Sequence, residues 1–279
     1  MRRVFRAAAT YAFVLLLTTS AAPAQDLSPA LAERFTQGVV HLKAGELDAA
    51  EEAFRGILRA GGERAFVHHN LGLVLRERGR HVDALGEFRA ATKLDPSFGA
   101  ARLLAGTTLL TLGRVREART ELEQAIRLMP RETIAHLQLA DACRRLDDQP
   151  CVVDAYRQVV HLAPDDAEYA YRLGTAYLKL SQWAHQRIRE IDPGSARLDQ
   201  ARGREFLAQG RPDLALRALE QAALTDPKLP EIHLALARIH FDERRFDDAA
   251  REVELELALV PSSREALELK RRIDAARRP

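Results

Sequence analysis

The sequence predicts an all-α fold, a solenoid of about seven helical hairpins followed by a C-terminal capping helix. Two observations lead to this prediction. Residues 68–96 follow the spacing His68-x-x-Leu71-Gly72-x-x-Leu75, then Gly79, Ala84-x-x-x-Phe88, Ala91 and Leu94-Asp95-Pro96. The same spacing recurs along most of the chain at a period of about 34 residues, which indicates a helical repeat array. The abundance of Ala, Leu, Arg and Glu suits helices.

Each part of the pattern has a geometric role in a pair of helices. Leu71 and Leu75 are four residues apart and therefore share one helix face. Ala84 and Phe88 begin a second apolar stripe with the same spacing. Gly79 lies between the stripes, where the first helix must end and the chain must reverse. The pattern therefore predicts an antiparallel helical hairpin.

Small residues in the pattern allow the two helices to approach closely. Gly72 and Ala84 carry little bulk, and Phe88 fills the space farther along the pair. Pro96 ends the unit because proline cannot continue a helix. One hairpin leaves an apolar face that only a neighbouring hairpin can cover, so stacking of the units is expected.

This unit resembles the tetratricopeptide repeat (TPR), whose signature has a large residue, Leu-Gly, an aromatic residue, Ala-x-x-x-Phe and a closing Pro. His68 stands where the family usually has Trp, and Leu75 where it usually has Tyr. The resemblance implies a non-catalytic scaffold that binds a protein or peptide partner, with the first helix of each hairpin lining a concave groove.

The predicted array occupies residues 25–263, and residues 264–279 form a capping helix and tail. The expected units are 31–64, 65–98, 99–132, 133–166, 167–195, 196–229 and 230–263. The capping helix is expected because Ala266, Leu269, Ile273 and Ala276 form one narrow apolar stripe in a highly charged segment.

The fifth unit departs from the period. It begins normally at Leu173-Gly174, but Gly174 and Pro193 are 19 residues apart, whereas Gly72 and Pro96 are 24 apart. We expect a shortened repeat over 167–195, and the alternative is one long bent helix from Ala167 to Glu190. Trp183 is expected to fill the space that the deletion leaves, or else to serve as an exposed anchor for a partner.

Residues 1–24 are predicted to be a secretory signal peptide. Three arginines precede an apolar run centred on residues 13–17, and Ala22-Pro23-Ala24 is a small-residue cleavage pattern. We therefore expect an exported protein, periplasmic or extracellular, with cleavage near Ala24. The alternatives are an uncleaved membrane anchor and a twin-arginine route for Arg2-Arg3. No integral span is expected in the mature chain.

The charge balance argues against general nucleic-acid binding. The whole chain has a formal charge of +2, and residues 1–24 contribute three arginines and no acidic residue. The remainder therefore has 39 basic and 40 acidic residues, a net charge of −1. A basic patch of the kind that nucleic-acid-binding domains carry is not indicated.

No catalytic or metal-binding constellation is evident, and no cofactor is expected. The sequence lacks a His-Glu-x-x-His pair, a glycine-rich phosphate loop and a Gly-x-Ser-x-Gly elbow. His68, His136 and His233 share one repeat position, which favours a packing role over a ligand role. An enzyme acting on envelope polymers and a membrane-anchored assembly factor remain the alternatives to a scaffold, and the oligomeric state is left open.

Cys143 and Cys151 are the only cysteines and lie on the two helices of the fourth hairpin. A disulfide between them is reasonable in an oxidising compartment and would brace the turn. The alternative is two small buried thiols, since free cysteine packs well in cores.

The resemblance also implies which side chains face the groove. In the family these are repeat positions 2, 5, 9, 12 and 13. Carried onto this chain, the candidate partner-binding residues are Phe66, His69, Leu73, Leu103, Leu137, Asp141, Arg144, Arg145, Tyr171, Lys179 and Arg204.

The apolar members of this set allow two interpretations. Superhelical packing buries them, or they form an apolar trough for an extended segment or helix, with Arg144, Arg145, Tyr171 and Lys179 as its polar end. A carboxylate clamp that some family members use is not expected, because only Asn70 agrees among its five matching positions.

Overall fold

The computed structural model describes residues 27–278, and the predicted signal peptide therefore lies outside the described residues. Within this range the protein has fourteen helices and no strand. It divides into two compact units, with the boundary between Leu173 and Gly174. Among the described helices, none is both long enough and apolar enough to cross a membrane.

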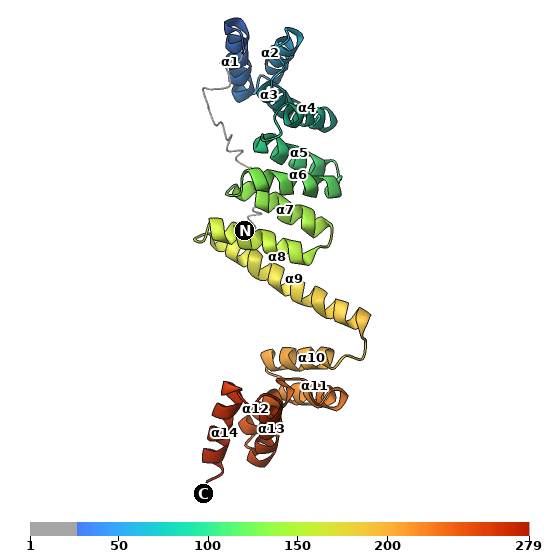
Figure 1. The fold of residues 1–279 in the computed structure, drawn as a ribbon, viewed down its shortest axis with the longest axis vertical. Coiled ribbons are helices and arrows are strands. Elements are labelled where there is room, and N and C mark those ends of the chain that lie inside the picture. The colour runs from blue at the N-terminus through green and yellow to red at the C-terminus, as the bar shows by residue number, and fades with distance from the viewer. Residues whose placement is uncertain (1–26, 279) are drawn as a thin grey trace, which may run out of the picture. The chain divides into compact units, whose positions relative to one another are not determined.

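The first unit is built from consecutive helix pairs, which follow one another in chain order in Figure 1. Helices α2, α4 and α6 each also pack on the first helix of the next pair, so these pairs stack as in a solenoid. Its helices are α1 (Pro29–Ala44), α2 (Leu47–Arg59), α3 (Ala65–Glu77), α4 (His81–Leu94), α5 (Gly99–Thr111), α6 (Val115–Leu128), α7 (Thr133–Arg145), α8 (Gln149–Leu162) and the start of α9 (Ala167–Ile191).

The second unit contains the remainder of α9, two further hairpins and a terminal helix. The helices are α10 (Ala196–Ala208), α11 (Pro212–Thr225), α12 (Ile232–Asp242), α13 (Phe246–Leu259) and α14 (Arg264–Ala276). Ala266, Leu269 and Ile273 of α14 are buried against Val253 and its neighbours on α13. Together the two units confirm the predicted all-α solenoid and its capping helix.

The hairpin turns need a residue with positive φ. Glycine supplies it at four turns, Gly45, Gly79, Gly113 and Gly210. In the fourth and last hairpins Asp147 (φ 56°) and Arg244 (φ 60°) adopt this conformation instead. The fourth turn is further held by Asp148, whose carboxylate accepts a hydrogen bond from the backbone N–H of Cys151.

Close helix contacts at glycine occur in several hairpins. A Cβ placed on Gly72 would lie 2.6 Å from the Phe88 ring, and one on Gly106 would lie 2.6 Å from Leu122. Phe88 and Leu122 are fully buried. Because real Cβ atoms do not approach so closely, only glycine lets these helices pack at this separation.

The fifth unit differs from the expected shortened hairpin. Residues Ala167–Ile191 form one helix of 25 residues, α9, drawn in yellow in Figure 1. The preferred interpretation was therefore wrong, and the alternative of a single long helix agrees with the structure. The physical reason is the five missing residues, which leave too little chain to end one helix and start another. Trp183 is partly buried.

Candidate partner-binding surface

Aromatic side chains of the first two first helices, α1 and α3, contact each other. The rings of Phe35 on α1 and Phe66 on α3 meet edge to face at 5.0 Å between centroids. Phe35 also lies 5.6 Å from Phe54 of α2. Phe35 and Phe66 are only partly buried, so this part of the predicted groove keeps an accessible apolar edge.

His69 extends this surface and is enclosed by aromatic rings. Its centroid lies 4.8 Å from that of Phe98 and 6.0 Å from that of Phe88. Burial in these apolar surroundings lowers the pKa of His69 to about 4, and the positive charge of Arg76 acts in the same direction. Its Nδ1 atom is buried and has no hydrogen-bond partner within the described residues. His69 is therefore a neutral, packed side chain at neutral pH.

The other apolar candidates divide into two groups. Leu73 and Leu103 are each 8% exposed and belong to the core. Leu137 is partly exposed, and Ile134, one turn earlier on α7, is 42% exposed. Superhelical packing thus buries Leu73 on α3 and Leu103 on α5, while α7 presents apolar surface.

The charged end of α7 is internally paired. Asp141 forms ion pairs with both Arg144 and Arg145, the latter at 2.7 Å. Arg145 also donates to the backbone carbonyl of Leu110, 2.9 Å away at the end of α5. Arg145 therefore joins two hairpins, whereas Arg144 is an exposed surface residue.

The remaining candidates lie on α9 and α10. Tyr171 is 70% exposed and lies in the first unit. Lys179 and Arg204 are exposed residues of the second unit, where Arg204 forms an ion pair with Glu231.

The in-register histidines have structural partners that sequence reasoning missed. Nδ1 of His68 lies 2.6 Å from Glu87, and Nδ1 of His233 lies 2.8 Å from Glu252. Hydrogen bonding to Glu87 raises the pKa of His68. Each glutamate follows its histidine by nineteen residues, and this repeated spacing is the signal that could have found the pairs.

The other ring nitrogen at this repeat position has its own partner in two hairpins. Nε2 of His136 lies 2.9 Å from the carbonyl oxygen of Pro130, and Nε2 of His233 lies 3.1 Å from that of Pro227. Both prolines close the preceding repeat. The histidines thus link a hairpin to the end of the previous one, which accounts for a polar residue at the position where the family usually has Trp.

Glu256 was also missed, because its repeat position is apolar in the other hairpins. It is 2% exposed, and its carboxylate accepts hydrogen bonds from the backbone N–H groups of Glu231 and Leu234. It therefore caps the start of α12 from the facing helix α13.

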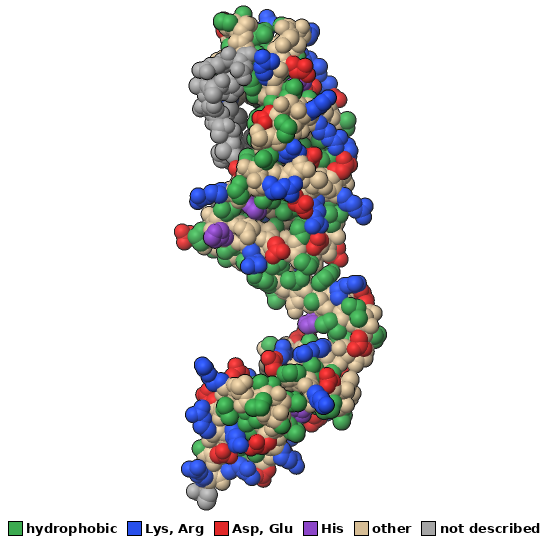
Figure 2. All heavy atoms as spheres, viewed as in Figure 1, with side chains coloured by type: hydrophobic (Ala, Val, Ile, Leu, Met, Phe, Trp, Pro, Cys, Tyr) green, Lys and Arg blue, Asp and Glu red, His purple; other side chains and the backbone are tan. Residues whose placement is uncertain are grey.

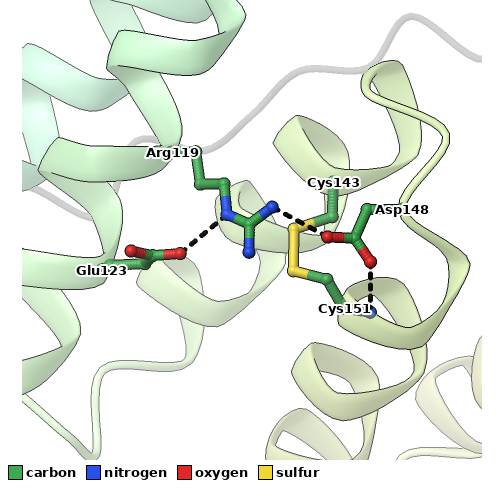
Figure 3. The surroundings of a disulfide bond; sticks show 5 residues. All are labelled: Arg119, Glu123, Cys143, Asp148 and Cys151. Carbon is green, nitrogen blue, oxygen red and sulfur yellow. Dashed lines mark hydrogen bonds and ion pairs between the residues drawn. A yellow bond between two sulfur atoms is a disulfide. The ribbon is translucent and has the colours of Figure 1, made fainter.

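Figure 3 shows the two cysteines of the fourth hairpin. Cys143 of α7 and Cys151 of α8 form a disulfide, with their Cα atoms 5.8 Å apart. Beside it, Arg119 of α6 binds Glu123 at 2.7 Å and Asp148 at 2.8 Å. The turn is thus tied both across itself and to the preceding hairpin.

Positive and negative side chains are interspersed over the face drawn in Figure 2, and neither sign dominates it. Within the described part of the chain, no group of three or more His, Cys, Asp or Glu residues is placed to hold a metal ion. The features described here are those of a contact surface, built from apolar edges and paired charges.

Comparison with known proteins gives matches of two kinds. One tetratricopeptide repeat model matches residues 35–97 and 201–264, and a second matches 75–140. The chain is 29% identical over 271 residues to cellulose synthase operon protein C of Xanthomonas axonopodis pv. citri, covering 90% of this chain. It is 23% identical over 251 residues to the BBSome complex member BBS4 homolog of Drosophila melanogaster, covering 84% of this chain. The chain spans 18% and 51% of the lengths of these two relatives.

A solved structure shares the fold over most of the chain. A tetratricopeptide repeat protein from Parabacteroides merdae superposes with a TM-score of 0.51 at 13% identity, over 88% of this chain and all of that one. The family models together match more than half of the sequence, on both sides of α9. The chain belongs to the tetratricopeptide repeat family, whose fold serves as a scaffold for protein–protein interaction.

Proposed function

We propose that this protein is an exported, non-catalytic scaffold that holds an extended or helical segment of a partner protein against the first helices of its N-terminal unit. The observation that carries the proposal is apolar surface that stays partly exposed on the first helices, from Phe35 and Phe66 on α1 and α3 and from Ile134 and Leu137 on α7. These residues lie on the helices that line the groove in this family. An accessible apolar strip bordered by charged residues is the form that helix-in-groove and extended-peptide recognition takes.

Charge at the edge of this strip refines the kind of partner. Arg144 is exposed and shares Asp141 with Arg145, so the three side chains carry a net charge of +1. An apolar segment with an acidic residue near one end complements this arrangement. Leu73 and Leu103 are buried core residues, and we do not assign them direct contact with a partner.

Export is part of the proposal and depends on the signal-peptide pattern of residues 1–24. The Xanthomonas relative is by name a product of a cellulose synthase operon, which suggests the proteins of such an assembly as the first partners to test. Edman sequencing of the protein from fractionated cells tests export directly. A mature N-terminus near Gln25 is expected, and a protein that retains Met1 in the cytoplasmic fraction contradicts this part of the proposal.

The binding experiment compares two exposed apolar residues in one unit. Ile134→Asp changes the proposed contact strip, whereas Val82→Asp, at a residue 70% exposed on the second helix α4, leaves the strip intact. A partner captured from an envelope extract by the unmodified chain should be lost with Ile134→Asp and kept with Val82→Asp. Loss of roughly tenfold in affinity is expected for one disrupted apolar contact. Equal binding by both variants would place the partner elsewhere.

A further inference from the structure

We infer that α9 is a dimerisation helix, which pairs antiparallel with α9 of a second copy of this chain. The inference begins at Gly174. This residue stands at the repeat position of Gly72, Gly106 and Gly203, each of which lies against a buried side chain of its second helix. A Cβ on Gly174, by contrast, would meet no atom within 4 Å.

The next residues of this register are also uncovered. Leu75 and Leu109 occupy the position three residues after the glycine and are fully buried, whereas Tyr177 is 47% exposed at the same position. Glycine within a helix costs about 1 kcal/mol relative to alanine, and close approach of another backbone is the usual reason to have it. Gly174 and Tyr177 thus form the contact face of a first helix whose second helix is absent.

The missing second helix is present in the sequence of α9 itself. Counting back from Pro193, Ser181, His185 and Ile188 stand where Ala84, Phe88 and Ala91 stand before Pro96. Counting forward from Gly174, Lys179 stands where Glu77 stands. The five residues without an equivalent therefore correspond to residues 78–82, which contain the turn glycine of the second hairpin.

Loss of a turn joins the two halves of a hairpin into one rod. The second half of α9 cannot fold back onto the first half, so the contact face of each half is left uncovered within one chain. A second copy supplies the missing half, which is the geometry of domain swapping, and shortened hinge loops are a known route to it.

One stripe of α9, in which Ala184 and Ile188 are partly buried and the other members are exposed, is complementary to itself. Gly174, Tyr177, Ser181, Ala184, Ile188 and Ile191 follow the alternating spacing of three and four that makes a seam between two long helices. Ile191 is 77% exposed, and Ser181 is exposed as well. Such a seam on a helix of 25 residues indicates a helical partner of similar length.

The midpoint of α9 decides the register. Lys179 is the central residue of Ala167–Ile191, and Gly174 and Ala184 lie at equal distances on either side of it, as do Tyr177 and Ser181. Two antiparallel copies that cross at their midpoints therefore place Gly174 opposite Ala184 of the second copy, and Tyr177 opposite its Ser181. Tyr177 therefore meets a small residue, Gly174 and Ala184 let the backbones approach, and the full length of both helices overlaps. A two-fold symmetric contact requires this self-complementarity.

The first test restores the turn. Inserting Arg-Gly-Arg-His-Val, the segment 78–82, between Lys179 and Leu180 lets α9 close as a hairpin within one chain. Light scattering after size-exclusion chromatography should give twice the chain mass for the unmodified protein and a single chain mass for the insertion variant. Circular dichroism should show the same helical character in both.

The second test blocks the contact without touching the fold. Gly174→Leu places a side chain where the structure has open space, and Gly86→Leu on α4 is the matched control, since a Cβ there also meets nothing within 4 Å. Gly174→Leu should weaken dimerisation by at least roughly tenfold, and Gly86→Leu should leave it unchanged.

The third test probes the seam in the folded protein with a single small substitution. Ser181→Cys lies close to the proposed two-fold axis and should be joined to its copy by a short bismaleimide, whereas Leu224→Cys, 79% exposed on α11, should not. A chain that is monomeric up to about 100 µM overturns the inference, because a seam of this length should associate well below that concentration. A dimer that survives both the insertion and Gly174→Leu, or cross-links equally from both cysteines, also overturns it.

Discussion

The α3–α4 hairpin and helix α9 begin with the same signature and have opposite environments. Leu71-Gly72 and Leu173-Gly174 each place a glycine on a first helix, yet Gly72 lies against the Phe88 ring and Gly174 faces open space. The difference comes from the chain that follows, which contains a turn in one case and is five residues shorter in the other. A repeat signature therefore specifies which face of a helix will make contact, and the length of the connection decides which helix makes it.

The two regions should differ most in how much stability the protein loses when an aromatic side chain is replaced by alanine. Phe88→Ala should lower the free energy of unfolding by about 3–5 kcal/mol, because Phe88 is fully buried and its removal leaves a cavity. Tyr177→Ala, measured where the chain is monomeric, should lower it by less than about 1 kcal/mol because Tyr177 is half exposed. Urea melts of both variants check this, and equal losses would show that the two environments are alike.

A second comparison concerns the turn itself. The fourth hairpin lacks a turn glycine and has the Cys143–Cys151 disulfide, which closes a loop of eight residues. Closing a loop of this size should stabilise the hairpin by about 2–3 kcal/mol through the entropy of the unfolded chain. Thiol counting should find no free thiol in the protein isolated without reductant, and reductant should lower the stability by that amount. Two free thiols in the isolated protein would show that the hairpin holds without the bond.

His69 makes the packed region sensitive to pH. Its pKa is about 4 in the folded chain and ordinarily 6.5, so the unfolded chain binds a proton first as the pH falls. Stability is therefore complete above pH 6.5 and is lost between pH 6.5 and 4, by about 2 kcal/mol at pH 5. His68 acts with the opposite sign, because its raised pKa gives stability below its ordinary value that is lost as the pH rises through the folded value.

The contribution of His69 is measured as a difference between two proteins. The unmodified chain and His69→Phe are compared by denaturant melts at pH 8 and pH 5. The two proteins have all other titrating groups in common, including His68, so their difference reports His69 alone. The unmodified chain should lose about 2 kcal/mol more than His69→Phe between these values. An identical pH dependence would mean that the ring of His69 is hydrated in the folded protein.

Substituting the glycines themselves sharpens the comparison. Gly72→Ala should destabilise the protein by about 1–3 kcal/mol, because the new Cβ would lie 2.6 Å from the Phe88 ring. Gly86→Ala, in the same hairpin but facing open space, should stabilise it by up to about 1 kcal/mol through helix propensity. Thermal melts give both values, and a neutral Gly72→Ala would mean that the hairpin has room to spread.

The fold was predictable because the residue pattern of one hairpin recurs along the chain. The spacing around Gly72 and Phe88 occurs in several copies, so one ambiguous hairpin is interpreted from its neighbours. The fifth unit had no such support, since a deletion of five residues fits either a short second helix or no turn at all. The spacing shows how many residues are missing, but it does not show whether they are missing from the turn or from the second helix.

The candidate surface was predicted less well because groove positions in a repeat do not have fixed burial. Leu73 of the second unit and Leu137 of the fourth unit both occupy predicted groove positions, yet Leu73 is buried and Leu137 is partly exposed. Burial depends on the local superhelical packing, which one sequence does not encode visibly. Glu256 was missed for a related reason, because a carboxylate at an apolar repeat position has meaning only once the start of α12 lies opposite it.

The smallest expected effect separates two neighbouring arginines at the end of α7. Arg144→Ala should lower stability by less than about 0.5 kcal/mol, because it removes an exposed ion pair with Asp141. Arg145→Ala should cost about 1 kcal/mol, because it also removes a charged hydrogen bond to the carbonyl of Leu110 on the preceding hairpin. Paired urea melts resolve the difference, and equal values would mean that Arg145 does not join the hairpins. If the surface is used as proposed, Arg144→Ala should still weaken partner binding, so that a residue with little effect on folding is the better probe of function.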